Sequence, residues 1–144
     1  MAILLRNTLI IIKDYLQRSG LFDSVDIGEP NAPIAGWHAS LLLTRVEIPE
    51  VTLTGTIERR TVLLRIYTEA YRDPRSDIEF GMDERQAKII EALLGDFDLG
   101  STVRDLEPTL ITVNYGYIEI GGKMHRVGEI ALVMTIDDSA TFVA

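Results

Sequence analysis

Cysteine is absent from this sequence of 144 residues, and histidine occurs only twice. Without cysteine the chain can form no disulfide, no thiol nucleophile and no zinc–thiolate site. A metal site usually needs three or four ligands at recognisable spacing, and neither His38 nor His125 has another histidine near it in the sequence. We therefore expect no metal, no cofactor and no catalytic group here, and we predict ordinary surface or strand-end roles for both histidines.

Basic residues are in the minority, with 14 lysines and arginines against 22 aspartates and glutamates, for a formal net charge of −8. Such a charge repels nucleic-acid phosphates and anionic membranes unless basic residues gather on one face. No apolar run approaches the roughly 20 residues that a membrane span needs. Arg6 and Asn7 interrupt the apolar N-terminus, and no cleavage site follows, so we expect synthesis in the cytoplasm and no membrane partner.

The usual sequence signatures of catalysis are missing as well. The glycines form neither a Walker-type loop nor a G-x-G-x-x-G pattern, and no serine lies in a G-x-S-x-G setting. Acidic residues are plentiful, but helix starts and solvated loops favour them without any catalytic role. We therefore predict that the protein is not an enzyme. The alternative from a different functional class is a small ligand-binding or enzymatic α+β domain.

What the sequence does contain is the pattern of one domain over residues 1–144. A hydrophobic fraction of 47% and a charged fraction of 25% are ordinary for a globular domain of this length. Apolar residues at helical spacing predict helices over 3–19 and 76–94, the second opened by a capping box from Ser76 to Glu79. Apolar runs predict strands over 22–28, 37–46, 58–69, 110–120 and 123–136, with room for a short strand over 102–106.

The connections between these elements set the expected topology. Gly121-Gly122 predicts a two-residue hairpin turn of a primed type. The order α-β-β-β-α-β-β favours the α+β class, with a mainly antiparallel β-sheet and two α-helices packed on it. Residues 47–57, which include Pro49 and Gly55, predict an extended arm or loop, and residues 137–144 predict a weakly structured acidic tail.

Several features leave room for contacts with another subunit. The first helix is apolar on more than one face, which fits either deep burial on the sheet or contact with a neighbour. Arginines gather over 59–75 among acidic residues, which fits inter-subunit ion pairs, a solvated surface or nucleic-acid contacts. Tyrosines at 67, 71, 115 and 117 fit either interface anchors or half-buried strand residues. The candidates for a subunit interface are Arg59, Arg60, Arg65, Leu4, Ile11, Val51 and Leu53.

The order of the elements and their residue patterns resemble those of one known family. An apolar N-terminal helix ends near Gly20-Leu21-Phe22, a short strand Val25-Asp26-Ile27-Gly28 follows, and the strand Arg60–Tyr67 comes after a variable arm. An Asp73-Pro74 loop leads into the helix Asp83–Leu94, and the chain closes with a Gly121-Gly122 hairpin that ends in Glu129–Ile136. Over nearly the whole chain, these features resemble the lambda-type tail terminator proteins of long-tailed bacteriophages.

The resemblance implies a structural virion protein. Members of that family form a homo-hexameric ring on the last ring of the tail tube protein, where they stop tube polymerisation. The ring offers a joining surface to the head-completion or neck protein, and genomic DNA passes through the lumen without sequence-specific binding. The chain would then be made in the host cytoplasm and reside in the tail or neck of the virion. Another neck component, such as a head–tail joining protein, is the nearest alternative.

Overall fold

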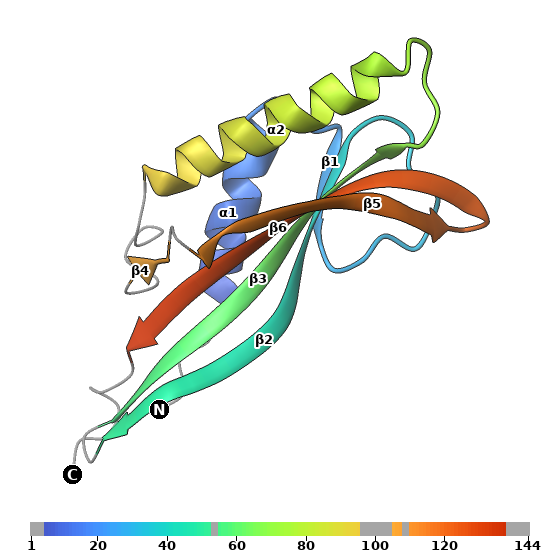
Figure 1. Ribbon diagram of the computed structural model, residues 1–144. Helices are drawn as coiled ribbons and strands as arrows, with labels where there is room; N and C mark the ends of the chain where they lie inside the picture. The colour runs from blue at the N-terminus through green and yellow to red at the C-terminus, as the bar shows by residue number, and fades with distance from the viewer. Residues whose placement is uncertain (1–4, 53–54, 96–104, 108–109, 138–144) are drawn as a thin grey trace.

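The computed structural model describes residues 5–52, 55–95, 105–107 and 110–137. These residues form two helices and a six-stranded sheet, which confirms the predicted α+β class (Figure 1). The helices are α1 (Arg6–Arg18) and α2 (Ser76–Leu94). The strands are β1 (Ser24–Ile27), β2 (His38–Thr52), β3 (Gly55–Glu69), β4 (Asp105–Leu106), β5 (Thr112–Ile120) and β6 (Lys123–Asp137).

The sheet is mixed, with one parallel pair among antiparallel ones. Its strands lie in the order β1-β2-β3-β6, and both β5 and β4 pair with β6 on the side away from β3. β1 runs parallel to β2, and the other pairs are antiparallel, so the predicted mainly antiparallel sheet is confirmed. The parallel pair, which the sequence analysis did not predict, arises because the loop over 28–37 carries the chain back along β1 instead of turning it tightly.

One face of the sheet carries the main hydrophobic core. Val62, Leu64 and Ile66 of β3 are fully buried at alternate positions, as the period-two pattern predicts. Both helices contribute to the same cluster, so they cover the same face (Figure 1). The helical members of the cluster are Leu9, Ile12, Leu16, Met82, Ile89 and Leu93, and Leu5 joins them from just before α1.

Helix α2 covers the predicted range but begins differently. Arg75 precedes it with helical φ and ψ, and no side chain caps the first turn, so the predicted capping box over 76–79 is wrong. The backbone N–H of Asp77 instead donates to the carbonyl oxygen of Pro74 at 3.2 Å. The main chain closes the first turn by itself, because the preceding residue is already helical.

Gly81 of α2 lies where a side chain has no room. A Cβ at this position would come within 2.4 Å of Cζ2 of Trp37. Trp37 stands just before β2, is buried, and has the Arg85 guanidinium over its ring at 3.8 Å. The glycine that lowers helix propensity thus lets α2 approach the indole closely.

The β5–β6 hairpin confirms the predicted turn. Gly121 and Gly122 have φ values of 57° and 81°, as a primed turn requires. A Cβ on Gly121 would also lie 2.7 Å from Cδ of Pro33. The turn therefore packs against the loop over 28–37.

Of the two alternatives for residues 47–57, the structure shows the extended arm. β2 and β3 stay paired out to Thr52 and Gly55, and β6 runs beside β3 as far as Ile57. The β2–β3 register shifts between Leu43 and Arg45 and again over 47–50. These strands reach well past the helices in Figure 1, and we refer to residues 43–61 as the arm. Residues 138–144 of the predicted tail lie outside the described residues.

Candidate functional site

The two histidines are buried, with 4% and 1% of their surface exposed, so the predicted surface role is wrong, although His38 does begin β2. Nδ1 of His38 lies 2.6 Å from Oγ of Ser24, and Nε2 lies 3.0 Å from Oγ of Ser40. Burial lowers the pKa of His38, and the nearby charge of Asp26 opposes that effect. The imidazole therefore serves as a buried polar link between β1 and β2.

His125 fastens the loop over 28–37 to the face of the sheet opposite the helices. Its Nε2 accepts a hydrogen bond from the backbone N–H of Ile34 at 2.9 Å, and its Nδ1 lies 2.9 Å from the carbonyl oxygen of Lys123. Ile34 packs on a small second cluster formed by Tyr67, Ile120 and Val127. Both histidines are thus used in holding the fold. In the described ranges no group of three or more potential metal-ligating residues occurs, and neither helix is long and apolar enough to cross a membrane.

Arg65, a predicted interface candidate, ties the same loop to the sheet. Its Nη1 lies 2.7 Å from Oε1 of Glu29 in the loop, and its Nη2 lies 3.0 Å from Oε1 of Glu129 on β6. Burial raises the pKa of Tyr67, although a hydrogen bond from Arg65 works against that rise. The acidic partners of Arg65 therefore belong to its own chain.

The neighbouring arginines differ from one another. Arg60 pairs with Glu58 at 2.6 Å, with both side chains only 16% exposed, so this candidate also has an acidic partner in its own chain. Nε of Arg59 is buried and has no hydrogen-bond partner among the described residues. Nε of Arg65 is likewise buried and without a hydrogen-bond partner among the described residues.

The apolar interface candidates fall into two groups. Ile11 of α1 is half-buried, and Val51 at the far part of the arm is 71% exposed. Leu4 and Leu53 lie outside the described residues. Whether these side chains meet another subunit stays a prediction.

The arm carries a row of exposed aliphatic side chains. Leu43, Val46 and Ile48 are 65%, 61% and 56% exposed, and Val51 continues the row. A hollow of about 390 Å³ lies where α1 approaches the arm, and it is lined by Leu5, Leu43, Thr44, Arg45, Val46, Arg60 and Thr61. Clustered exposed apolar side chains on a soluble domain mark a contact surface.

β5 forms the opposite edge of the sheet. It pairs with β6 from Thr112 to Ile120 without a register shift, and in the described part of the chain no strand lies on its other side. It contains neither proline nor lysine, the residues that commonly blunt an open edge. At its centre, no atom lies within 4 Å of the place where a Cβ on Gly116 would be. The strand therefore offers a regular edge with a gap in its row of side chains.

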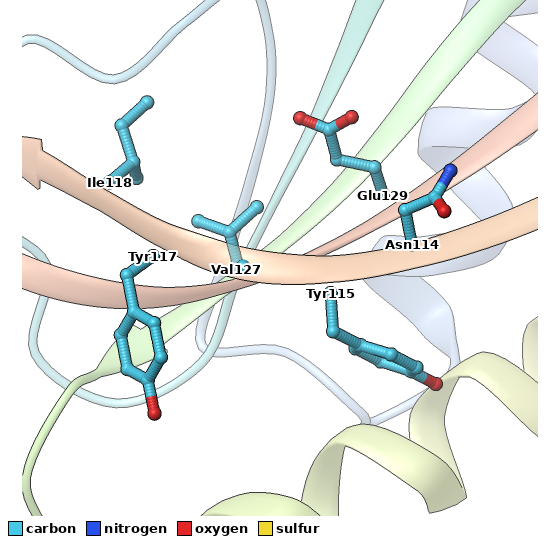
Figure 2. Close-up of a pocket in the computed structure, with 7 residues that line it drawn as sticks. Asn114, Tyr115, Tyr117, Ile118, Val127 and Glu129 are labelled. Carbon is cyan, nitrogen blue, oxygen red and sulfur yellow. The ribbon is translucent and has the colours of Figure 1, made fainter.

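A hollow of about 230 Å³ surrounds this gap and is lined by Asn114, Tyr115, Gly116, Tyr117, Ile118, Val127 and Glu129. We refer to it as the Gly116 hollow. Figure 2 shows the two tyrosines on the side of β5 toward a helix, and Ile118, Val127 and Glu129 on the other side. Pockets that bind small molecules usually measure about 300–1,000 Å³. The hollow is smaller than that range, and it suits a protein side chain better than a substrate.

Arg126 fixes the tyrosine side of this edge. Its guanidinium lies 4.7 Å from the ring centre of Tyr117 and 5.7 Å from that of Tyr115. It also pairs with Glu79 of α2 through two bonds of 3.0 and 3.2 Å, and it donates to the carbonyl oxygen of Gly116 at 3.1 Å. These bonds join the β5 edge to α2 through one guanidinium.

The sequence analysis named the two β5 tyrosines as possible anchors but missed Arg126 and Gly116. The signal for Gly116 was present, since a glycine within a strand often marks a site of close approach. Arg126 gave no local signal, because its partner Glu79 lies 47 residues away.

The geometry shows two dissimilar surfaces on opposite edges of one sheet, and comparisons with known proteins add no relative. A scan against models of protein families finds no match, and a search of curated proteins finds no significant match.

Proposed function

We propose that this chain is a structural assembly protein, a tail terminator that forms a homo-hexameric ring on the end of a phage tail tube. In that role it stops tube polymerisation and offers the neck or head-completion protein a joining surface, while DNA passes through the lumen. The proposal starts from the resemblance described above. It takes its structural support from one observation, that each subunit carries both an exposed aliphatic arm and an open strand edge.

These two surfaces differ from one another and lie at opposite edges of the sheet. Beyond Leu41, where its pairing with β1 ends, β2 is the edge on one side, and β5 is the edge on the other. A contact between unlike patches is heterologous, and repetition of such a contact gives a closed ring when the rotation closes. A formal net charge of −8 also suits a conduit for DNA, because a repulsive wall lets the duplex slide.

Light scattering on the purified protein, with negative-stain images of the same peak, tests the ring. Six copies of the 16.1 kDa chain have a mass of about 97 kDa (six times 16.1 kDa). We expect a hexamer with a central hole, formed either in solution or on added tail tubes, and tube ends that stop growing when capped. A protein that neither forms a ring nor binds tube ends would contradict the proposal, and binding to a head connector alone would favour another neck role.

Deletion of residues 49–55 tests the part that the arm plays. The described residues of the deleted segment contribute nothing to the hydrophobic core, so the circular dichroism spectrum and the fluorescence of the buried Trp37 should not change. We expect the shortened protein to lose ring formation or capping. Normal rings and normal capping after this deletion would show that the arm tip has no role in assembly.

A further inference from the structure

We propose that the occupant of the Gly116 hollow is the arm of a second copy of this chain, with an aliphatic side chain of that arm inserted beside Gly116. This contact rests on the proposed ring of identical subunits and specifies how one subunit would join the next. It is a contact through side chains, with the arm crossing β5 near the middle of the strand.

The shapes of the two surfaces favour a contact of this kind. β2 has two register shifts within the arm and carries Pro49, so it offers no long regular edge for strand pairing. On β5, the Arg126 guanidinium already occupies the carbonyl oxygen of Gly116. Regular main-chain pairing is therefore hindered on both the arm and β5. The features left for a contact are the projecting side chains of the arm and the hollow on β5.

The chemistry of the two surfaces is complementary. The floor of the hollow includes Ile118 and Val127, which suit an aliphatic guest such as Val46 or Ile48. The side chains of Tyr115 and Tyr117 extend from the other side of β5, toward the helix (Figure 2). Exposed aliphatic side chains of this kind gather on the arm, and the hollow is too small for an ordinary small molecule.

Charge points to the same occupant. Glu129, at the rim of the hollow, shares the guanidinium of Arg65 with Glu29, so this cluster holds two carboxylates and one arginine. The arm brings Arg45, whose side chain is 67% exposed and pairs with the exposed Glu47 at 3.1 Å. Such an exposed pair is weak, so Arg45 can turn to carboxylates of a neighbouring subunit at little cost.

Disulfide trapping tests this contact directly, because the chain has no cysteine of its own. The variants Val46→Cys and Asn114→Cys are purified separately, mixed, oxidised and separated on a non-reducing gel. A disulfide forms readily only when the two Cα atoms come within about 7 Å. We expect a mixed dimer from this pair and none from Val46→Cys mixed with Glu91→Cys, which places the second thiol on an exposed position of α2. No mixed dimer, or equal amounts in both mixtures, would overturn the proposal.

Filling the hollow provides the second test. Gly116→Val adds a side chain where the isolated subunit has open space, so Tm should stay within about 2 °C of the unmodified protein. Association measured by sedimentation should weaken about tenfold or more. The control is Ala87→Val, which introduces the same side chain on the exposed side of α2 and should leave association unchanged. Equal association of the two variants would contradict the proposed contact.

The outcomes separate this inference from the proposed function. Rings that cap tubes but give no Val46–Asn114 cross-link would refute the contact and leave the terminator role intact. A specific cross-link in a protein that ignores tube ends would support the contact and refute the terminator role. A protein that stays monomeric at all accessible concentrations and gives no mixed dimer would overturn the contact.

Discussion

Replacement of Gly81 by alanine tests the packing that places α2 on the sheet, and the sign of the effect depends on two opposing contributions. In an exposed helix, alanine in place of glycine stabilises by about 1 kcal/mol. At this position the added Cβ would lie 2.4 Å from Cζ2 and 2.8 Å from Cη2 of Trp37. Carbon atoms pack best at about 3.5–4.0 Å, so more than about 1 Å of overlap must be relieved.

The surroundings leave little room for that relief. The indole is 7% exposed and lies beneath the guanidinium of Arg85, which donates to the carbonyl oxygens of Leu21 and Gly81 at 2.7 and 3.1 Å. Overpacking of a well-packed site costs about 1–3 kcal/mol, and the size of this overlap places the cost near about 2–3 kcal/mol. After the gain in helix propensity, we expect Gly81→Ala to destabilise the protein by about 1–2 kcal/mol.

Urea unfolding is the assay, followed by far-ultraviolet circular dichroism and by fluorescence of Trp37, the one tryptophan in the sequence. The control is the double variant with Trp37→Phe, which removes the ring atoms that clash. In that background Gly81→Ala should be neutral or stabilising when measured by circular dichroism. A Gly81→Ala protein that is more stable than the unmodified one in the Trp37 background would refute the close packing of α2 on the indole.

Three further outcomes are expected from urea titrations. Gly121→Ala should lower the free energy of unfolding by at least about 1 kcal/mol more than Gly122→Ala does. Both glycines have positive φ, but only a Cβ on Gly121 meets a proline ring, at 2.7 Å. Equal losses of stability in the two variants would contradict this. Glu79→Gln should cost less than about 1 kcal/mol, since its ion pair with Arg126 is 56% exposed on the glutamate side, and a loss twice that size would show that the pair matters more than its exposure implies. The folded protein has a lowered pKa at His38, so the unfolded chain takes up the proton first, and stability should fall as the pH drops below about 6.5. His38→Gln should weaken that pH dependence, and an identical dependence in the variant would assign it to other groups.

The secondary structure was predictable because its signals are local. The apolar run over 58–69 predicted the strand β3, and Gly121-Gly122 predicted a turn with positive φ. The Ser76 capping box failed because the conformation of the preceding residue, which the Asp73-Pro74 loop sets, was helical already. A capping pattern describes side chains and leaves out the backbone that leads into the helix.

The arm and the β5 edge were predictable only in part. The exposure of Val51 agrees with the extended arm that was one of the two predictions for residues 47–57. Tyr115 and Tyr117 of β5 share one face, as the period-two spacing of a strand predicts. The hollow at Gly116 was not predictable, because a glycine in a strand does not reveal which neighbouring side chains surround the gap.

By itself, the sequence determined the α+β class, the approximate ranges of the helices and main strands, the hairpin turn and the absence of thiol chemistry. These depend on spacing within a few residues, or on composition alone. Only the tertiary structure decided that β1 pairs in parallel with β2, that Arg65 meets Glu29 across 36 residues, and that Arg126 meets Glu79 across 47. Contacts of that kind depend on how segments far apart in the chain come together. A local pattern of residues therefore does not predict which charged side chains will pair.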